Sequence, residues 1–355
     1  MDKLTIRLSR QYDVLMDDDL LDFCGSIIKE VTGPCRICMV TDSTVNELFS
    51  ERVEHSLLAA GFEVHKAVFA PGEGTKSIES LGQLLEFLAE REFTRSDVLA
   101  ALGGGVIGDL TGFAAATYLR GIRFIQIPTT LLAAVDASVG GKTAINLKAG
   151  KNLAGAFWQP SLVLFDPETL SQLPNHIFLD GLAEVIKSGA IMDQELFTYV
   201  SRAEEPDFTR FVKHCVMASI KVKRTLVEGD ERDTGQRQLL NFGHTAGHAI
   251  EKCSEYRISH GHAVAIGMLI AARASWKMAW SRYDCSMPIR NVLLKYNYPI
   301  DCGFSAGQLT EAALRDKKRK GDTMNLVIPL KIGECALMEI PVSALGEFIS
   351  AGMEA

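Results

Sequence analysis

Two hydrophobic patterns alternate along the chain up to about residue 170. Short apolar runs end at polar or glycine-rich segments, and they occupy residues 37–40, 62–69, 98–102, 124–128 and 162–165. Between the earlier runs, apolar residues recur every third or fourth position, most regularly over 78–90. Short runs of this kind predict strands, and the longer periodic segments predict helices. Strands separated by helices predict a mainly parallel sheet with helices on its faces.

The alternation stops after Asp166, and the remaining pattern is helical. Helical periods occupy residues 182–202, 206–228, 239–253 and 260–282. We therefore expect an α/β domain over residues 1–172 and a mostly α-helical domain over residues 173–355.

Composition narrows the class of protein. The 355 residues carry 37 Lys plus Arg and 44 Asp plus Glu, a net charge of −7, which is unlike a general nucleic-acid binder with its basic face. No apolar run approaches the length of a membrane span, and the first residues lack the apolar core of a signal peptide. The eight cysteines are scattered, as expected for reduced thiols. We therefore expect a soluble, cytoplasmic protein that contacts neither membranes nor nucleic acid.

Cys35 and Cys38 form the one closely spaced cysteine pair. A redox or zinc function for such a pair needs a helix N-terminus or a second pair. Here the pair opens an apolar, strand-like run, so we interpret these cysteines as strand and core residues.

Residues 103–108 fit the pattern G-x-G-x-x-G between a predicted strand and a predicted helix over 110–119. Glycines there let the backbone approach a pyrophosphate, and a helix N-terminus offers it free N–H groups. The motif follows the third predicted strand instead of the first, and no acidic residue stands about 20 positions later. Asp42, at the end of the first predicted strand, is the candidate to hold a ribose. The pattern indicates a nucleotide-binding site whose strand order and acidic residue differ from those of the usual dinucleotide-binding fold.

The segment 136–146 partly resembles a phosphate-binding loop, because Gly-Gly-Lys-Thr occupies 140–143. Asp136 stands where that loop needs its first glycine, which disfavours a Walker site. Lys142, Lys148 and Lys151 form a cationic patch next to Asn152. The patch suits an anionic ligand, and a solvated loop explains it equally well.

Four of the eight histidines fall within residues 244–262. His244 and His248 share one helix face, but Thr245 stands where a zinc protease would have Glu. Catalytic zinc takes three protein ligands and keeps one position open. Two of these histidines with Glu184 would provide them, and spacing alone does not say which two.

Several segments together resemble the 3-dehydroquinate synthase family. They follow the family's order over nearly the whole chain and include residues 103–121, 128–146, GLAEVIKSG at 181–189, NFGHTAGHAIE at 241–251, HGHAVAIGM at 260–268 and DKK at 316–318. The resemblance implies a Rossmann-like NAD-binding domain and a helical domain in a cytoplasmic homodimer. It also implies a lyase of the shikimate pathway, which converts 3-deoxy-arabino-heptulosonate 7-phosphate to 3-dehydroquinate and phosphate. The implied cofactors are NAD, which oxidises C5 and later returns the hydride, and one zinc or cobalt ion.

The resemblance also implies roles for individual residues. The metal ligands would be Glu184, His244 and His260. Residues facing NAD would be Asp42, Glu73, Lys76, Gly104, Gly105, Val106, Asp109, Thr129, Thr130 and Leu132, with Asp136 and Lys142 between cofactor and substrate. Substrate contacts would come from Arg120, Lys151, Asn152, Lys187, Lys223, Arg237, Asn241 and His248, joined by either Lys317 or Lys318.

Two positions depart from the family's pattern. His262 stands where the family commonly has Glu, which could affect metal affinity or the bonding around His260. Gln172 stands where the family usually has Thr, which leaves one expected cofactor contact in doubt.

Three other interpretations compete with this one. The His-Gly-His at 260–262 resembles sister cyclases that act on sedoheptulose 7-phosphate, but those tend to lose the histidine that this chain keeps at His248. A metal-dependent polyol dehydrogenase would lack the 183–187 and 316–318 elements and would release NADH. A catalytically silent nucleotide-binding protein would have no chemical reason to retain all three ligands.

Overall fold

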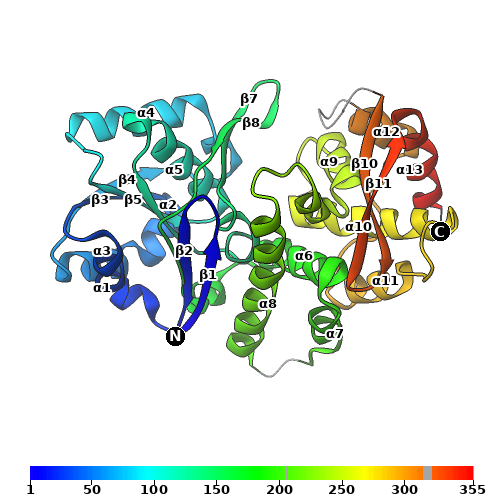
Figure 1. The fold of residues 1–355 in the computed structure, drawn as a ribbon, viewed down its shortest axis with the longest axis horizontal. Helices are drawn as coiled ribbons and strands as arrows, with labels where there is room; N and C mark the ends of the chain where they lie inside the picture. Colours follow the sequence, from blue (N-terminus) through cyan, green and yellow to red (C-terminus); the bar gives the residue numbers. More distant parts are fainter. Residues whose placement is uncertain (205–206, 315–321, 355) are drawn as a thin grey trace. The chain divides into compact units, whose positions relative to one another are not determined.

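The computed structural model describes residues 1–204, 207–314 and 322–354. The chain forms two compact units, Met1–Pro174 and Asn175–Ala355 (Figure 1). The first is an α/β unit and the second is mostly helical, as the hydrophobic pattern predicted. No helix within the described ranges is long and apolar enough to cross a membrane.

A seven-stranded sheet forms the centre of the N-terminal unit, in the order β1-β2-β9-β6-β5-β3-β4. The strands are β1 (Asp2–Arg7), β2 (Gln11–Met16), β3 (Arg36–Asp42), β4 (Glu63–Phe69), β5 (Val98–Gly103), β6 (Arg123–Pro128) and β9 (Leu162–Phe165). All neighbouring strands run parallel except the hairpin β1–β2. The five predicted strands are confirmed.

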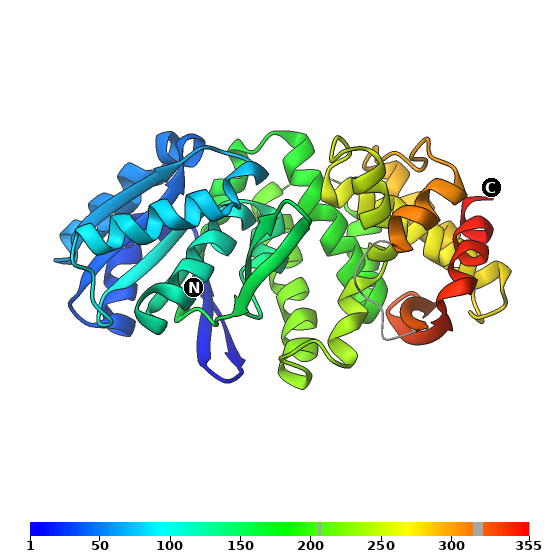
Figure 2. The same ribbon diagram turned by 90° about the horizontal axis from the view of Figure 1, so that it is seen from above.

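The glycine motif follows the fifth strand of the chain, so its placement after the third was wrong. The hairpin β1–β2 supplies the two extra strands, and its turn projects from the unit (Figure 2). Near the turn, over residues 3–7 and 11–14, buried residues alternate with more exposed ones, and side chains pair locally, as Thr5 does with Asp13 (2.6 Å). The hairpin therefore lacks the continuous apolar run that identified the other strands.

Helices cover both faces of this sheet, which explains why its inner strands are mostly apolar on both faces. The helices are α1 (Leu20–Thr32), α2 (Ser43–Val45), α3 (Glu51–Ala59), α4 (Ile78–Glu90) and α5 (Gly105–Thr117). In β3, Ile37 and Met39 belong to one core with α1 and α3, while Cys38 and Val40 belong to another with α4 and α5 (Figure 1). All eight cysteines are free thiols; Cys38 is buried in β3, and Cys35 lies half-buried just before that strand.

A second hairpin, β7 (Lys142–Leu147) with β8 (Gly150–Phe157), pairs outside the main sheet. It contains the lysine-rich segment that the sequence left open between an anion site and a solvated loop. Lys142 and Lys148 are exposed on it, whereas Lys151 is half-buried.

The C-terminal unit is built around α10 (His260–Lys277), whose apolar residues are buried along nearly the whole helix. Its other helices are α6 (Asn175–Met192), α7 (Gln194–Arg202), α8 (Phe208–Gly229), α9 (His244–Cys253), α11 (Ser286–Lys295), α12 (Ala306–Leu314) and α13 (Leu345–Met353). Helices α6, α9, α11 and α13 all pack against α10.

Some boundaries differ from the predicted helices. The predicted helix 182–202 is two helices, because the Asp193 side chain accepts the backbone N–H of Leu196 and begins α7. The predicted helix 239–253 begins only at His244, since Gly243 adopts a left-handed conformation (φ 79°). The antiparallel hairpin of β10 (Thr323–Lys331) and β11 (Glu334–Pro341) was not predicted.

Asp97 ties the start of β3 to the loop before β5. Its carboxylate accepts the backbone N–H groups of Arg36 (3.0 Å) and Thr94 (2.7 Å) and a guanidinium N–H of Arg36 (3.1 Å). Burial acts to raise the pKa of Asp97, but these hydrogen bonds outweigh it and hold the pKa below its ordinary value. Because the folded pKa lies below the unfolded one, the stabilisation is present above about pH 4. It is lost as the pH falls through the folded pKa.

We expect Asp97→Asn to lower the free energy of unfolding at pH 7 by about 1–3 kcal/mol, because an amide nitrogen faces donors. The difference from the parent chain should shrink as the pH falls below about 4. Urea unfolding followed by circular dichroism at several pH values measures both. Glu86→Gln, at an exposed position of α4, is the control. A difference that stays constant with pH would contradict the role of the Asp97 charge.

Candidate metal centre and nucleotide loop

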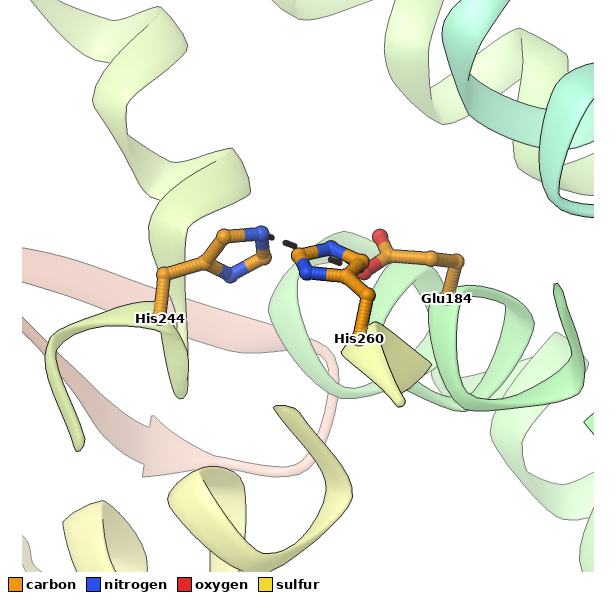
Figure 3. A group of neighbouring side chains, drawn as sticks. All are labelled: Glu184, His244 and His260. Carbon is orange, nitrogen blue, oxygen red and sulfur yellow. Dashed lines mark ion pairs between the residues drawn. The ribbon is translucent and has the colours of Figure 1, made fainter. Parts of the chain in front are cut away.

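Three helices of the C-terminal unit bring Glu184, His244 and His260 together (Figure 3). Glu184 lies in the middle of α6, and the two histidines are the first residues of α9 and α10. Glycines allow this close approach, since a Cβ at Gly243 or Gly267 would collide with the facing helix. The side chains of these three residues, which are far apart in sequence, thus lie close together.

The geometry leaves one oxygen of Glu184 directed at both imidazoles. Its Oε1 lies 3.9 Å from Nε2 of His244 and 3.7 Å from Nε2 of His260. The Oε1 atom is buried and has no hydrogen-bond partner among the described residues. A buried carboxylate oxygen without a partner is costly, and a cation between these three atoms would remove the cost. One carboxylate and two imidazoles are a common ligand set for catalytic zinc.

Lys187 neutralises the other side of this carboxylate. It lies one turn after Glu184 on α6 and pairs with Oε2, and both side chains are almost fully buried. Lys187 therefore brings a desolvated positive charge next to the three candidate ligands.

Hydrogen bonds behind the two histidines fix their tautomers. Nδ1 of His260 lies 3.1 Å from Oε2 of Glu251, and Nδ1 of His244 lies 3.2 Å from the carbonyl oxygen of Phe242. Both oxygens accept, so each Nδ1 carries the proton and each Nε2 presents its lone pair toward Glu184. Burial acts to lower the pKa of His260, but the hydrogen bond and charge of Glu251 raise it above its ordinary value.

Sequence reasoning missed Glu251. The signal was present, because His244, His248 and Glu251 are spaced four and three residues apart and so lie on one face of α9. Glu251, His248 and His260 form a second group with the spacing of metal ligands. The first group is the stronger candidate, since Glu251 already accepts from His260 whereas Oε1 of Glu184 has no such bond.

The structure places the other predicted residues of this unit as follows. The His248 ring lies 5.3 Å from the His244 ring and 6.1 Å from the His260 ring, measured between centroids. Lys223 is buried on α8, Arg237 is buried on the short helix Gln236–Asn241, and Asn241 ends that helix. Lys317 and Lys318 lie outside the described residues.

The glycine loop of the N-terminal unit has the features of a phosphate cradle. Gly103 ends β5, and α5 begins at Gly105 with no side chain of the described residues capping it. A Cβ on Gly104 would lie 3.1 Å from Thr130, and one on Gly105 would lie 3.3 Å from Ala137. Substitution would therefore crowd the loop, and the uncapped N–H groups can bind an anion. The helix starts earlier than predicted because its first turn contains the glycines.

The remaining candidates for the cofactor surround this loop. Thr129 donates its backbone N–H to Gly103 (3.0 Å), and its buried hydroxyl oxygen has no hydrogen-bond partner among the described residues. Asp42 ends β3, the strand beside β5, and caps α2 through the N–H groups of Thr44 and Val45. The others lie in the first two turns of α5 or in the segment after β6, and they are Val106, Asp109, Thr130, Leu132 and Asp136. Gln172 ends the short helix Pro167–Gln172.

Lys76 joins the loop after β4 to α5 and to the β7–β8 hairpin. Its buried ammonium lies 2.5 Å from Asp109 and 2.5 Å from the side-chain oxygen of Asn152. Asn146 continues the network, because it donates to Glu73 (2.7 Å) and accepts the backbone N–H of Asn152 (2.9 Å). Burial raises the pKa of Asp109, and the charge of Lys76 opposes that rise. The hairpin is thus held against the nucleotide loop. Arg120 is exposed at the end of the helical turn after α5.

Comparison with known proteins places this chain among relatives of full length. Models of the N-terminal and C-terminal parts of 3-dehydroquinate synthase match residues 66–180 and 181–319. The chain is 42% identical to 3-dehydroquinate synthase of Enterococcus faecalis over 98% of each chain.

Solved structures agree in fold. A 2-deoxy-scyllo-inosose synthase complexed with carbaglucose-6-phosphate, NAD⁺ and Co²⁺ matches with a TM-score of 0.85 at 24% identity, over 99% of this chain and 100% of that one. A 2-epi-5-epi-valiolone synthase from Streptomyces hygroscopicus with NAD⁺ and Zn²⁺ bound matches with a TM-score of 0.86 at 22% identity, over 98% of each chain.

If Glu251 orients His260, Glu251→Gln should weaken zinc binding to the metal-free protein by about 10- to 100-fold, because an amide no longer selects the Nδ1–H tautomer. Competition with a chromophoric chelator measures this affinity without an activity assay. Glu255→Gln, at an exposed position just beyond α9, should leave it unchanged. Equal zinc affinity in Glu251→Gln and the parent chain would refute the assignment.

Proposed function

The chain belongs to the 3-dehydroquinate synthase family, and on that premise we propose how its residues divide the work of the family's reaction. That reaction converts 3-deoxy-arabino-heptulosonate 7-phosphate to 3-dehydroquinate and phosphate. The buried, unpartnered Oε1 of Glu184 between two imidazoles is the observation that carries the proposal, because it supports a cation site among these three residues.

We propose that Glu184, His244 and His260 hold one divalent ion. Structural relatives with NAD⁺ and Zn²⁺ or Co²⁺ support this choice of cofactors. The ion would supply a Lewis acid for the C4 and C5 hydroxyl groups of the substrate. Lys187 would hold its ammonium against the same carboxylate and limit the negative charge that the ion must balance.

The glycine loop would hold NAD. Its uncapped N–H groups would bind the pyrophosphate, Asp42 would accept from a ribose, and Thr129 would use its unpartnered hydroxyl. NAD would supply a hydride acceptor for C5 and return the hydride later, so the reaction has no net redox change. Lys76 would fix Asp109 and Asn152 next to this site through its two hydrogen bonds.

The remaining cations would bind the anionic groups of the substrate. The substrate carries a phosphate dianion and a carboxylate, and a chain of net charge −7 needs local cations to bind it. The candidate groups for the substrate contacts, which include two asparagines besides the cations, are Arg120, Lys142, Lys151, Asn152, Lys187, Lys223, Arg237, Asn241 and His248.

His248 would move protons during the cycle. Once C5 is a ketone, the neighbouring C–H is acidic, so phosphate elimination demands little of an enzyme base. His248 lies beside both ligand histidines without belonging to their group with Glu184. An imidazole side chain can both donate and accept a proton near neutral pH.

The sister cyclases remain the alternative for substrate choice. The clue in their favour was His262, but in the structure this side chain contacts Asp180 and Ser259. These contacts favour a structural part for His262 within the C-terminal unit. The homodimer and the cytoplasmic location implied by the family stay predictions.

Purified protein given the heptulosonate 7-phosphate, NAD and zinc or cobalt should release phosphate over many turnovers without accumulating NADH. A chelator should abolish the release. Steady NADH from a simple polyol, without phosphate release, would instead identify a dehydrogenase. Turnover of sedoheptulose 7-phosphate alone would identify a sister cyclase.

His248→Asn should lower kcat by about 10²- to 10⁴-fold, the usual contribution of a proton-transferring group. Zinc affinity should stay within a few-fold of the parent value, because His248 is not among the three proposed ligands. Phosphate release and chelator competition measure the two effects separately. Loss of zinc binding in parallel with kcat would reassign His248 as a ligand.

A further inference from the structure

Asp180 collects three contacts from the residues on either side of His260. Its Oδ1 accepts from the hydroxyl of Ser259 (2.6 Å) and lies 3.0 Å from Nδ1 of His262. The same oxygen accepts the backbone N–H of His262 (3.3 Å). Because an ionised carboxylate only accepts, Nδ1 of His262 carries the shared proton. We call these three residues, Asp180, Ser259 and His262, the clamp.

The clamp performs the N-cap function of α10 from another helix. Ser259 occupies the N-cap position, but its side chain does not cap the helix because it donates to Asp180. The third helical N–H, which an N-cap side chain would normally accept, goes to Asp180 instead. A carboxylate at this position also interacts favourably with the helix dipole. The first turn of α10 is therefore fixed to α6.

This fixation joins two of the three candidate ligands. Asp180 lies four residues before Glu184, one turn earlier on the same face of α6. Ser259 and His262 flank His260 on the other side of the contact. The clamp thus determines how far the start of α10, with His260, stands from Glu184.

Two further contacts leave the clamp little room to shift. A Cβ on Gly261 would overlap the backbone of Asp180, so the two helices are already in contact there. The ring of buried Tyr298 lies 5.2 Å from the ring of His262, and its hydroxyl donates 2.5 Å to the carbonyl oxygen of Leu179. The His262 side chain is therefore held between Asp180 and Tyr298.

We propose that Asp180, Ser259 and His262 are positioning residues that set the distance between Glu184 and His260, and that Nδ1 of His262 acts as a hydrogen-bond donor to Asp180 beside the hydroxyl of Ser259. This inference rests on the proposed metal centre. In this proposal His262 supports the metal centre and does not contact the substrate directly. A carboxylate at position 262 would face the carboxylate of Asp180, remove a donor and push α10 away from α6.

The test compares zinc affinities of the metal-free full-length chain by chelator competition. His262→Glu should weaken zinc binding at least 10-fold through repulsion from Asp180. Adding Asp180→Asn to His262→Glu should restore most of that loss, because the new amide can donate to the new carboxylate. His176→Glu, which makes the same change at an exposed position of α6, should leave the affinity unchanged.

A milder variant and a spectroscopic readout separate positioning from general damage. Ser259→Ala removes one hydroxyl and should weaken zinc binding by a few-fold while the thermal midpoint changes little. Cobalt-loaded His262→Glu should show shifted ligand-field bands, and the double variant should return them toward the parent positions. Parental affinity and spectra in His262→Glu and Ser259→Ala would overturn the clamp. Failure of the parent chain itself to bind one zinc would overturn the metal centre.

Discussion

The buried carboxylate of Glu184 is the constraint on which the C-terminal unit depends. A charge taken out of water is stabilised only if every lone pair finds a partner. One oxygen is paired with Lys187, and the other faces two imidazole nitrogens without a hydrogen bond of its own. The fold alone therefore leaves half of this charge uncompensated, and a cation at that point would complete it. Stability without an ion and affinity for an ion make opposite demands here. An uncompensated carboxylate oxygen lowers the stability of the ion-free fold, and the same oxygen favours ion binding.

The surrounding helices keep this arrangement from relaxing. Glycines at 243 and 267 bring α9 and α10 into backbone contact, so the two histidines at their N-termini cannot spread apart. Glu251 fixes the ring of His260 from behind. Asp180 fixes the first turn of the same helix to α6. The positions of the three candidate ligands are thus set by backbone packing and by the carboxylates of Glu251 and Asp180. Proteins usually orient metal-binding imidazoles through such second hydrogen bonds.

Sequence patterns predicted the parallel sheet and most helices for a physical reason. A strand such as β5, buried on both faces, has no polar side chain, and α4 has a regular helical period. The hairpins β1–β2, β7–β8 and β10–β11 were not predicted, because most of their strands lack the long apolar runs by which the other strands were found. The histidines and Glu184 stood out by residue type. Glu251 and Asp180 did not stand out, because their hydrogen-bond partners come from another helix and meet them only when α6, α9 and α10 pack together.

A buried charge also organises part of the N-terminal unit, and there the charge is positive. The ammonium of Lys76 is buried, and Asp109 and Asn152 surround it from α5 and from the β7–β8 hairpin. Removing Asp109 would take the nearest counter-charge from Lys76 in a poorly hydrated place, which costs more than the lost contact itself. The hairpin therefore takes its position from the same charged group that contacts α5. A change at Lys76 should disturb both segments together, because one desolvated ion pair holds them.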